Sequence, residues 1–167
     1  LDVGAIAKGY ATEQVTKAAI DKGYTDFLLS VGGNVRALGG RDKEKGPWNV
    51  GIQNPDKESE QYSLYTLALN NLSLVSSGDY ERYYTVNGKK YHHIIDPVTL
   101  YPAEYMTAVT ILCMDSGYAD ALSTAVFNMP YEEGLEYINS LPDAEALWVL
   151  KDGSLKYSDG FMEYVKK

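Results

Sequence analysis

Cysteine is almost absent from this sequence, because Cys113 is the single one among 167 residues. This scarcity excludes an internal disulfide and argues against a metal site built from several thiolates. Cys113 lies in an apolar run at residues 109–114, where a thiol usually behaves as a small hydrophobic group. We therefore expect Cys113 to be buried in the core.

Long hydrophobic runs and an excess of basic residues are also missing. No stretch of 18 apolar residues occurs, so we expect no membrane span. Lys and Arg number 15 against 23 Asp and Glu, and the formal net charge is −8. This balance argues against broad binding of nucleic acid or of anionic membranes, both of which need a basic surface. It remains compatible with one anionic ligand that is held locally through a metal ion.

The sequence does contain enough apolar material for one folded domain. Its residues are 45% hydrophobic, and we expect a single domain over residues 1–167. Fifteen tyrosines are typical of strands and of partly exposed surfaces. A stacking role for some of these rings is compatible with the composition but is not specific.

Hydrophobic periodicity predicts more strands than helices, without regular alternation of the two. We expect helices over residues 8–22, 115–128 and 131–140, the first with an apolar stripe of Ala7, Ala11, Val15, Ala18 and Ala19. Strands are expected over residues 27–31, 35–38, 48–53, 64–69, 72–76, 80–86, 90–95, 107–114, 146–150 and 155–158. The Asn87-Gly88 pair is a strong hairpin signal. These elements favour an α+β fold with a largely antiparallel sheet and packed helices.

A carboxylate and a hydroxyl lie four residues apart in the second predicted helix. Asp120 and Thr124 would share one face of that helix, where their oxygens suit Mg²⁺. The same spacing also occurs by chance in many helices. At the other end of the chain, residues 2–9 offer a glycine turn and Lys8 at a helix start, which suits a phosphate group. Lys8 could equally be a solvated helix residue.

Two adjacent histidines follow the predicted hairpin. His93 is our candidate general base, because an imidazole titrates near neutral pH, and His92 should point to the opposite face of the strand. A zinc pair is a weaker interpretation because a third histidine and further cysteines are missing. Both could also be ordinary strand residues. Asp96 either orients His93 or stabilises the turn before Pro97, and the turn is the safer interpretation.

Six segments, in order, resemble the ApbE-like family of FAD:protein FMN transferases. They are DVGAIAKGYATE (2–13), SVGGNVRALG (30–39), WNVGIQNP (48–55), VSSGDYERYY (75–84), YHHIIDPVTLYPA (91–103) and ADALSTAVFNM (119–129). The resemblance covers nearly the whole chain. It implies an ApbE-like fold and an enzyme that uses Mg²⁺ to move FMN from FAD to a Thr or Ser hydroxyl of a target protein, with release of AMP.

The resemblance also implies roles for individual residues. The metal ligands would be the Ala5 carbonyl, Asp120 and Thr124, and the FAD contacts would be Asp2, Lys8 and Ile94, the last through its backbone. Together with our own assignment of His93, this makes His93 and Asp120 the candidate catalytic residues. The family often has Thr-Gly where this chain has Thr99-Leu100, so the geometry of that turn could differ.

Family members have about as much chain again before the first segment, so we expect this chain to be the C-terminal part of a longer protein. The same resemblance implies an extracytoplasmic location, membrane-anchored or periplasmic. The acceptor should be a separate protein, because residues 152–158 match the family's acceptor pattern only loosely. Two alternatives stay open. One is hydrolysis of FAD to FMN and AMP, and the other is a flavin-binding or structural domain without activity.

Overall fold

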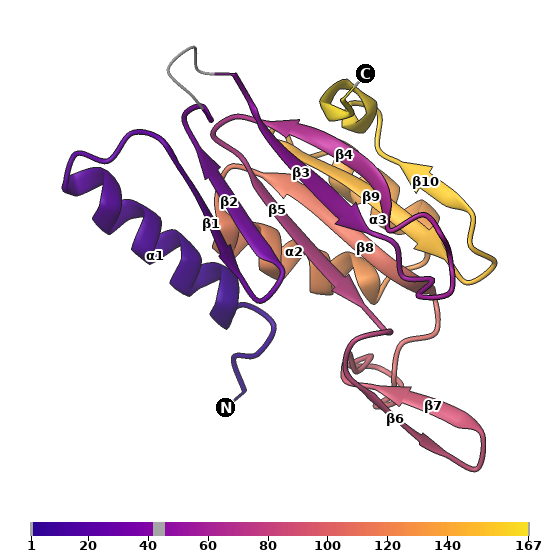
Figure 1. Ribbon diagram of the computed structural model, residues 1–167. Coiled ribbons are helices and arrows are strands. Elements are labelled where there is room, and N and C mark those ends of the chain that lie inside the picture. Colours follow the sequence, from indigo (N-terminus) through magenta and orange to yellow (C-terminus); the bar gives the residue numbers. More distant parts are fainter. Residues whose placement is uncertain (1, 42–45, 167) are drawn as a thin grey trace.

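The protein is built around one antiparallel sheet, seen in a computed structural model that describes residues 2–41 and 46–166. The sheet has six strands in the order β1-β2-β5-β8-β9-β10, and every neighbouring pair is antiparallel. Its strands are β1 (Phe27–Val31), β2 (Asn34–Leu38), β5 (Ser73–Gly78), β8 (Met106–Cys113), β9 (Ala144–Leu150) and β10 (Leu155–Tyr157). The expected α+β fold with a largely antiparallel sheet is confirmed (Figure 1).

Both faces of this sheet are covered. Helices α1 (Ala7–Asp21), α2 (Ser116–Phe127) and α3 (Tyr131–Asn139) lie on one side. A two-stranded sheet of β3 (Trp48–Gln53) and β4 (Ser63–Leu69) covers the other, together with the short helix η1 (Phe161–Tyr164). The molecule therefore has three layers and two hydrophobic cores (Figure 1).

Strand alternation explains why the two cores share the central strands. On β8, Ile111 and Cys113 belong to the core on the helix side, whereas Leu112 between them belongs to the core beneath β3 and β4. Successive side chains of a strand point to opposite faces, so a strand covered on both sides reads as a continuous apolar run. Cys113 is buried, 4% exposed, as expected.

A hairpin of β6 (Tyr83–Val86) and β7 (Lys89–His92) projects from the body of the molecule (Figure 1). Asn87 and Gly88 both have positive φ, 51° and 78°, which a tight turn of this kind requires. The predicted hairpin is confirmed, although its strands are shorter than the expected residues 80–86 and 90–95. Residues 80–82 and 93–95 lie outside the two strands and connect them to the rest of the chain.

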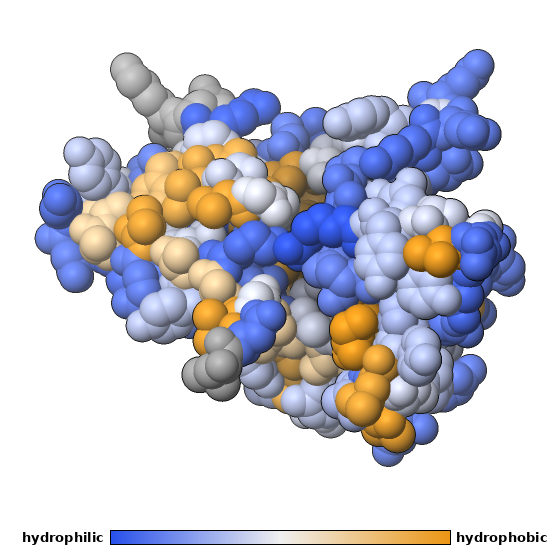
Figure 2. Space-filling model, turned by 90° about the horizontal axis from the view of Figure 1, so that it is seen from below, coloured by the Kyte–Doolittle hydropathy of each residue, from blue (hydrophilic) through white to orange (hydrophobic). Residues whose placement is uncertain are grey.

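Helix α1 is oriented differently from the usual amphipathic helix. Its buried residues are Gly9, Thr12, Glu13 and Thr16, whereas Val15 in the apolar stripe is 54% exposed. Figure 2 shows apolar side chains gathered on the surface at the end of the molecule where α1 lies. The stripe exists as predicted, but α1 is held to the rest of the fold by its polar face. Contacts that hold α1 therefore have to be polar, and they lie next to the candidate site.

The start of α2 follows a familiar capping pattern. Asp115 is the N-cap, and its carboxylate accepts a hydrogen bond of 2.9 Å from the backbone N–H of Tyr118. This cap sets the position of the first turn of α2, and Asp120 follows one turn later. Across residues 2–41 and 46–166, no helix has the length and apolar character needed to cross a membrane.

Candidate functional site

The N-terminal turn of α1 contacts Asp120 on α2 directly. The backbone N–H of Gly9 donates a hydrogen bond of 2.8 Å to Asp120 Oδ2, and Asp120 is only 4% exposed. In a regular helix this N–H would bond to the carbonyl of Ala5. Within the described residues, that carbonyl receives no other backbone N–H and Asp120 Oδ1 has no hydrogen-bond partner. Two oxygen atoms, the Ala5 carbonyl and Asp120 Oδ1, are thus left without a hydrogen-bond donor among the described residues.

Thr124 adds a third oxygen one turn further along α2. The side chain is half-buried, and its Oγ1 donates a hydrogen bond of 3.4 Å to the Asp120 carbonyl. A carboxylate, a hydroxyl and a backbone carbonyl form a hard oxygen donor set that fits Mg²⁺, which keeps water or phosphate oxygens as its other ligands. Among the described residues no group of three His, Cys, Asp or Glu side chains could hold a metal ion. The predicted ligand set of Ala5, Asp120 and Thr124 therefore contains one carboxylate. Its other two ligands are a backbone carbonyl and a hydroxyl.

The close approach of the two helices depends on Gly9. A Cβ added there would lie 2.5 Å from Asp120 Cβ and 2.9 Å from the carbonyl carbon of Ser116. Such distances are far inside van der Waals contact, and both neighbours are part of or attached to the α2 backbone. Only glycine fits at this crossing, so Gly9 is the residue that lets the N-terminal turn of α1 reach Asp120.

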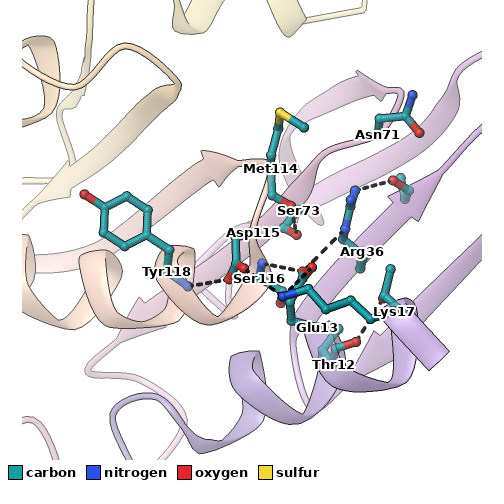
Figure 3. Close-up of polar contacts among 12 residues, drawn as sticks. Thr12, Glu13, Lys17, Arg36, Asn71, Ser73, Met114, Asp115, Ser116 and Tyr118 are labelled. Carbon is teal, nitrogen blue, oxygen red and sulfur yellow. Dashed lines mark hydrogen bonds and ion pairs between the residues drawn. The ribbon is translucent and has the colours of Figure 1, made fainter. Parts of the chain in front are cut away.

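A buried carboxylate on α1 secures the same helix pair one turn away. Glu13 Oε2 accepts a hydrogen bond of 3.0 Å from the backbone N–H of Ser116, the first residue of α2 (Figure 3). A negative charge is favourable at a helix N-terminus. Arg36 Nε on β2 and Lys17 Nζ each lie 3.7 Å from this carboxylate. Glu13 therefore joins α1, α2 and the sheet.

Arg36 would be costly to bury without Glu13. Burial lowers the pKa of the Arg36 guanidinium, and the charges of Glu13 and Asp115 act in the opposite direction. Neither Glu13 nor Arg36 was among the site residues predicted from the sequence. The available signal was strongest for Arg36, which is the one charged residue of the segment 30–39.

Lys8, next to Gly9, lines a cavity of about 680 Å³. Its Nζ donates hydrogen bonds to the Gly32 carbonyl at 3.3 Å and to Asn34 Oδ1 at 3.2 Å. We call this space the Lys8 cavity; among its other lining residues are Gly33, Gly51, Gly78, Tyr80, Arg82 and His93. The fold therefore brings Lys8 and His93, which are distant in sequence, to one cavity beside the Asp120 site.

His93, our candidate general base, lines the Lys8 cavity. Its Nδ1–H donates to the Arg82 carbonyl at 3.3 Å, which leaves Nε2 unprotonated and free to accept a proton. Burial lowers the pKa of His93, and the positive charge of Arg82 lowers it further. The imidazole is therefore neutral near pH 7. The role of His93 stays a prediction, and its position supports it.

His92 has a different environment and a structural role. Its Nε2–H donates to the Ala103 carbonyl at 2.8 Å, and its Nδ1 accepts from the Ile94 N–H at 3.3 Å. Both ring nitrogens are thus used inside the protein, so His92 and His93 do not form a zinc pair. The expectation that the two side chains face opposite ways is confirmed, because His92 is 6% exposed whereas His93 is on the surface.

The remaining predicted FAD contacts lie outside the residues that line the Lys8 cavity. Ile94 is buried, and its carbonyl accepts a hydrogen bond of 3.0 Å from the Ala103 N–H. Asp2 is exposed and its Oδ1 accepts from the Gly4 N–H at 2.7 Å, which shapes the glycine turn. Neither residue is shown to touch a ligand, and both assignments stay predictions.

Asp96 stabilises the turn at Pro97, which was the safer of the two interpretations given for it. Its Oδ1 accepts from the backbone N–H groups of Val98, at 2.8 Å, and Thr99, at 3.4 Å. Leu100 follows with φ of 61°, the left-handed conformation that favours glycine. The chain therefore keeps the turn despite the leucine that stands where the family often has glycine.

We expect Leu100→Gly to stabilise the protein by about 0.5–1 kcal/mol. The substitution removes the steric cost of a left-handed leucine, and the 74% exposed side chain contributes little packing. Urea denaturation of the variant and the unmodified protein measures the difference. Val98→Gly, at an exposed position in the same loop without positive φ, is the control and should not stabilise. A loss of stability in Leu100→Gly would contradict the argument.

Comparison with known proteins identifies the family of this chain. A profile of the ApbE family matches residues 1–148. The chain is 34% identical to the FAD:protein FMN transferase of Treponema pallidum, over 99% of this chain and 48% of that protein, and 35% identical to one from Klebsiella pneumoniae, over 91% and 46%. The chain thus spans about half the length of these relatives.

Solved structures give the same result for the fold. The crystal structure of an ApbE protein from Thermotoga maritima superposes with a TM-score of 0.90 at 34% identity, covering all of this chain and 54% of that one. The apo flavinyl transferase ApbE of Pseudomonas stutzeri superposes with a TM-score of 0.81 at 28% identity, covering 98% of this chain and 51% of that one. With the family profile matching most of its length, this chain belongs to the ApbE family.

Proposed function

We propose that the protein containing this chain transfers FMN from FAD to a Ser or Thr hydroxyl of a separate acceptor protein, releasing AMP, with Mg²⁺ as the metal. The observation that carries this proposal is the hydrogen bond from the Gly9 N–H to Asp120 Oδ2. It leaves oxygens of Ala5 and Asp120 free beside the Lys8 cavity, which also contains His93. The relatives named as FAD:protein FMN transferases support the same activity.

The chain offers one group for each requirement of diphosphate cleavage. Asp120, Thr124 and the Ala5 carbonyl would hold Mg²⁺, which neutralises charge on the phosphate oxygens when bound. Lys8 would place a positive charge against a phosphate. Its Nζ is held between Gly32 and Asn34, which fixes the direction of that charge.

The proposed transfer step uses His93 as a base. Nε2 of His93 accepts the proton of the acceptor hydroxyl while the hydroxyl oxygen forms a bond to the phosphorus of the FMN half. The bond from that phosphorus to the bridging oxygen breaks, and AMP leaves with the bridging oxygen. Water in place of the hydroxyl would make the same step a hydrolysis, which is the second candidate reaction.

The function is tested by incubating the wild-type protein and an acceptor peptide with FAD, with and without Mg²⁺. The AMP released and the masses of the protein and the peptide are then measured. The acceptor probe is a peptide carrying the family's motif with one Thr. AMP together with an FMN adduct on the peptide, dependent on Mg²⁺, supports the transferase. AMP with free FMN and an unlabelled peptide would make the protein a hydrolase, and no AMP would leave only binding or a structural role.

We expect no adduct on this chain itself in that experiment. The nearest match to the acceptor motif lies in the turn between β9 and β10, where Ser154 Oγ donates a hydrogen bond of 2.6 Å to Asp152 Oδ1. Ser158 is 3% exposed and its hydroxyl donates to Glu145. The Ser158 hydroxyl is thus buried and the Ser154 hydroxyl is engaged by Asp152, which supports a separate acceptor. An extracytoplasmic location is part of the same proposal and is tested by fractionation of the source cells.

The rate should rise with pH through the pKa of His93 and level off above it. The active base is the neutral imidazole, and burial and Arg82 both hold its pKa below the ordinary value of 6.5. Arg82→Gln removes the positive charge, so the acid limb of kcat/KM should move to higher pH. Lys22→Gln, an exposed cation at the C-terminal end of α1 and outside the residues lining the Lys8 cavity, is the control. An unmoved acid limb in Arg82→Gln would argue against His93 as the base.

A further inference from the structure

The hairpin β6–β7 has few attachments to the rest of the protein. Its two strands form a separate two-stranded sheet and, within residues 2–41 and 46–166, pair only with each other. An isolated hairpin of this size is marginally stable in water, so its orientation depends on contacts at its base. His93 directly follows β7, and its N–H donates to the Arg82 carbonyl at 3.3 Å, just before β6. Whatever fixes the hairpin therefore also fixes His93.

Asp79 is a buried carboxylate at this base, with no part in the proposed reaction. It follows β5 directly, its side chain is 8% exposed, and its backbone N–H donates to the Thr107 carbonyl at 3.0 Å. Oδ1 lies 2.8 Å from Lys90 Nζ on β7, and Oδ2 lies 2.7 Å from Lys151 Nζ in the turn between β9 and β10. One carboxylate thus joins the sheet, the hairpin and a distant turn.

The two ion pairs are strong enough to offset the burial of this carboxylate. Burial by itself raises the pKa of Asp79, but the hydrogen bonds and charges of Lys151 and Lys90 outweigh it and leave the pKa below its usual value. Lys90 Nζ also lies 4.5 Å from the centre of the Tyr83 ring on β6. The contact therefore reaches both strands of the hairpin.

The alternation of side chains on β7 connects this anchor to the candidate site. Lys90 and His92 are two residues apart and share one face of the strand, where Lys90 binds Asp79 and His92 binds the Ala103 carbonyl. His93 comes next, is exposed where His92 is buried, and lines the Lys8 cavity. Attachment of the hairpin to the body thus also positions Arg82 and His93, which flank the two strands and line the cavity.

We infer that Asp79 is a positioning residue that holds the β6–β7 hairpin through Lys90 and Lys151 and so keeps His93 directed into the Lys8 cavity. This inference rests on the proposed function for its effect on rate. Its structural content, the attachment of the hairpin, does not depend on which reaction occurs.

Asp79→Asn in the full protein is the first variant to measure. The amide keeps the shape of the side chain and loses the charge that attracts two ammonium groups. We expect kcat for FMN transfer to the motif peptide to fall about tenfold to a hundredfold, because a displaced catalytic group costs that much. KM for FAD should change less than twofold. The acid limb of the pH profile should move to higher pH, because a displaced His93 is less buried and burial is the main cause that lowers its pKa.

Two further substitutions separate positioning from simple loss of stability. Lys151→Met removes one ion pair from an exposed turn without touching either core, and it should lower kcat as Asp79→Asn does. Lys151→Arg keeps a positive charge for Asp79 and should retain the wild-type kcat. Glu104→Gln is the matched control, because Glu104 pairs with Lys89 of the same hairpin at 3.3 Å but is 76% exposed. Exposed pairs contribute little, so this variant should behave as wild type.

Limited trypsin digestion gives a readout that needs no catalysis. Cleavage after Lys89 or Lys90 should be faster in Asp79→Asn and Lys151→Met than in wild type or Glu104→Gln. Wild-type kcat, pH profile and cleavage rate in both variants would overturn the inference, as would a loss of rate that only follows a loss of global stability. If wild-type protein labels no acceptor, the proposed function fails, and the digestion alone decides whether Asp79 attaches the hairpin.

Discussion

Asp120→Asn should reduce AMP release by about two to three orders of magnitude, because it removes the one carboxylate of the proposed metal site. The amide oxygen can still accept the hydrogen bond from the Gly9 N–H, which is 2.8 Å in the unmodified protein. The fold should therefore be kept while the negative charge that binds the metal is lost. Initial rates of AMP release at saturating FAD, over a range of Mg²⁺ concentrations, measure the effect.

Asp21→Asn is the matched control for this substitution. Asp21 is exposed at the end of α1, at the opposite end of the helix from Gly9, and its replacement should leave the rate unchanged. If high Mg²⁺ partly restores the rate of Asp120→Asn, the loss is one of metal affinity. An Asp120→Asn protein with the wild-type rate and the wild-type Mg²⁺ dependence would show that Asp120 is not a ligand.

Gly9→Ala should destabilise the protein by about 2–4 kcal/mol, although alanine is intrinsically the better helix residue by about 1 kcal/mol. The added Cβ would lie 2.5 Å from Asp120 Cβ and 2.9 Å from the Ser116 carbonyl carbon, so α1 and α2 would have to separate. The hydrogen bond from Gly9 to Asp120 would be lost with them. Urea denaturation measures the stability, and AMP release should fall in the folded fraction as well.

Gly134→Ala provides the control for helix propensity. Gly134 is a buried helical glycine in α3, where a Cβ would meet its nearest neighbour, the Trp148 ring, at an ordinary 3.5 Å. This variant should be neutral or up to about 1 kcal/mol more stable. The two substitutions are chemically identical, so opposite outcomes would identify the helix crossing as the cause. Equal stability of both variants would contradict a tight contact between α1 and Asp120.

Local sequence signals were sufficient wherever the deciding contacts are close in the chain. Asn87-Gly88 adopts the two positive φ angles that the hairpin needs, and the apolar run of β8 is buried on both faces. Asp115 caps α2, and Asp120 and Thr124 occupy one side of that helix. Each of these features depends on residues within one turn or one strand, whose geometry is set by the backbone itself.

The tertiary structure alone decided which face of α1 is buried and which charges meet. The apolar stripe of α1 predicts a buried face, yet Glu13 is the residue that packs against Ser116, 103 positions away. Asp79 likewise meets Lys151, 72 positions away, and no periodicity relates the two.

The sequence by itself therefore determined the elements, the antiparallel α+β class and the residue types of the candidate site. The mutual placement of Gly9 with Asp120, of Lys8 with His93 and of Asp79 with its two lysines came only from packing. The physical reason is that a local pattern constrains dihedral angles and faces. Partners across the fold are selected instead by the simultaneous burial of two cores and by the need of each buried charge for an opposite one.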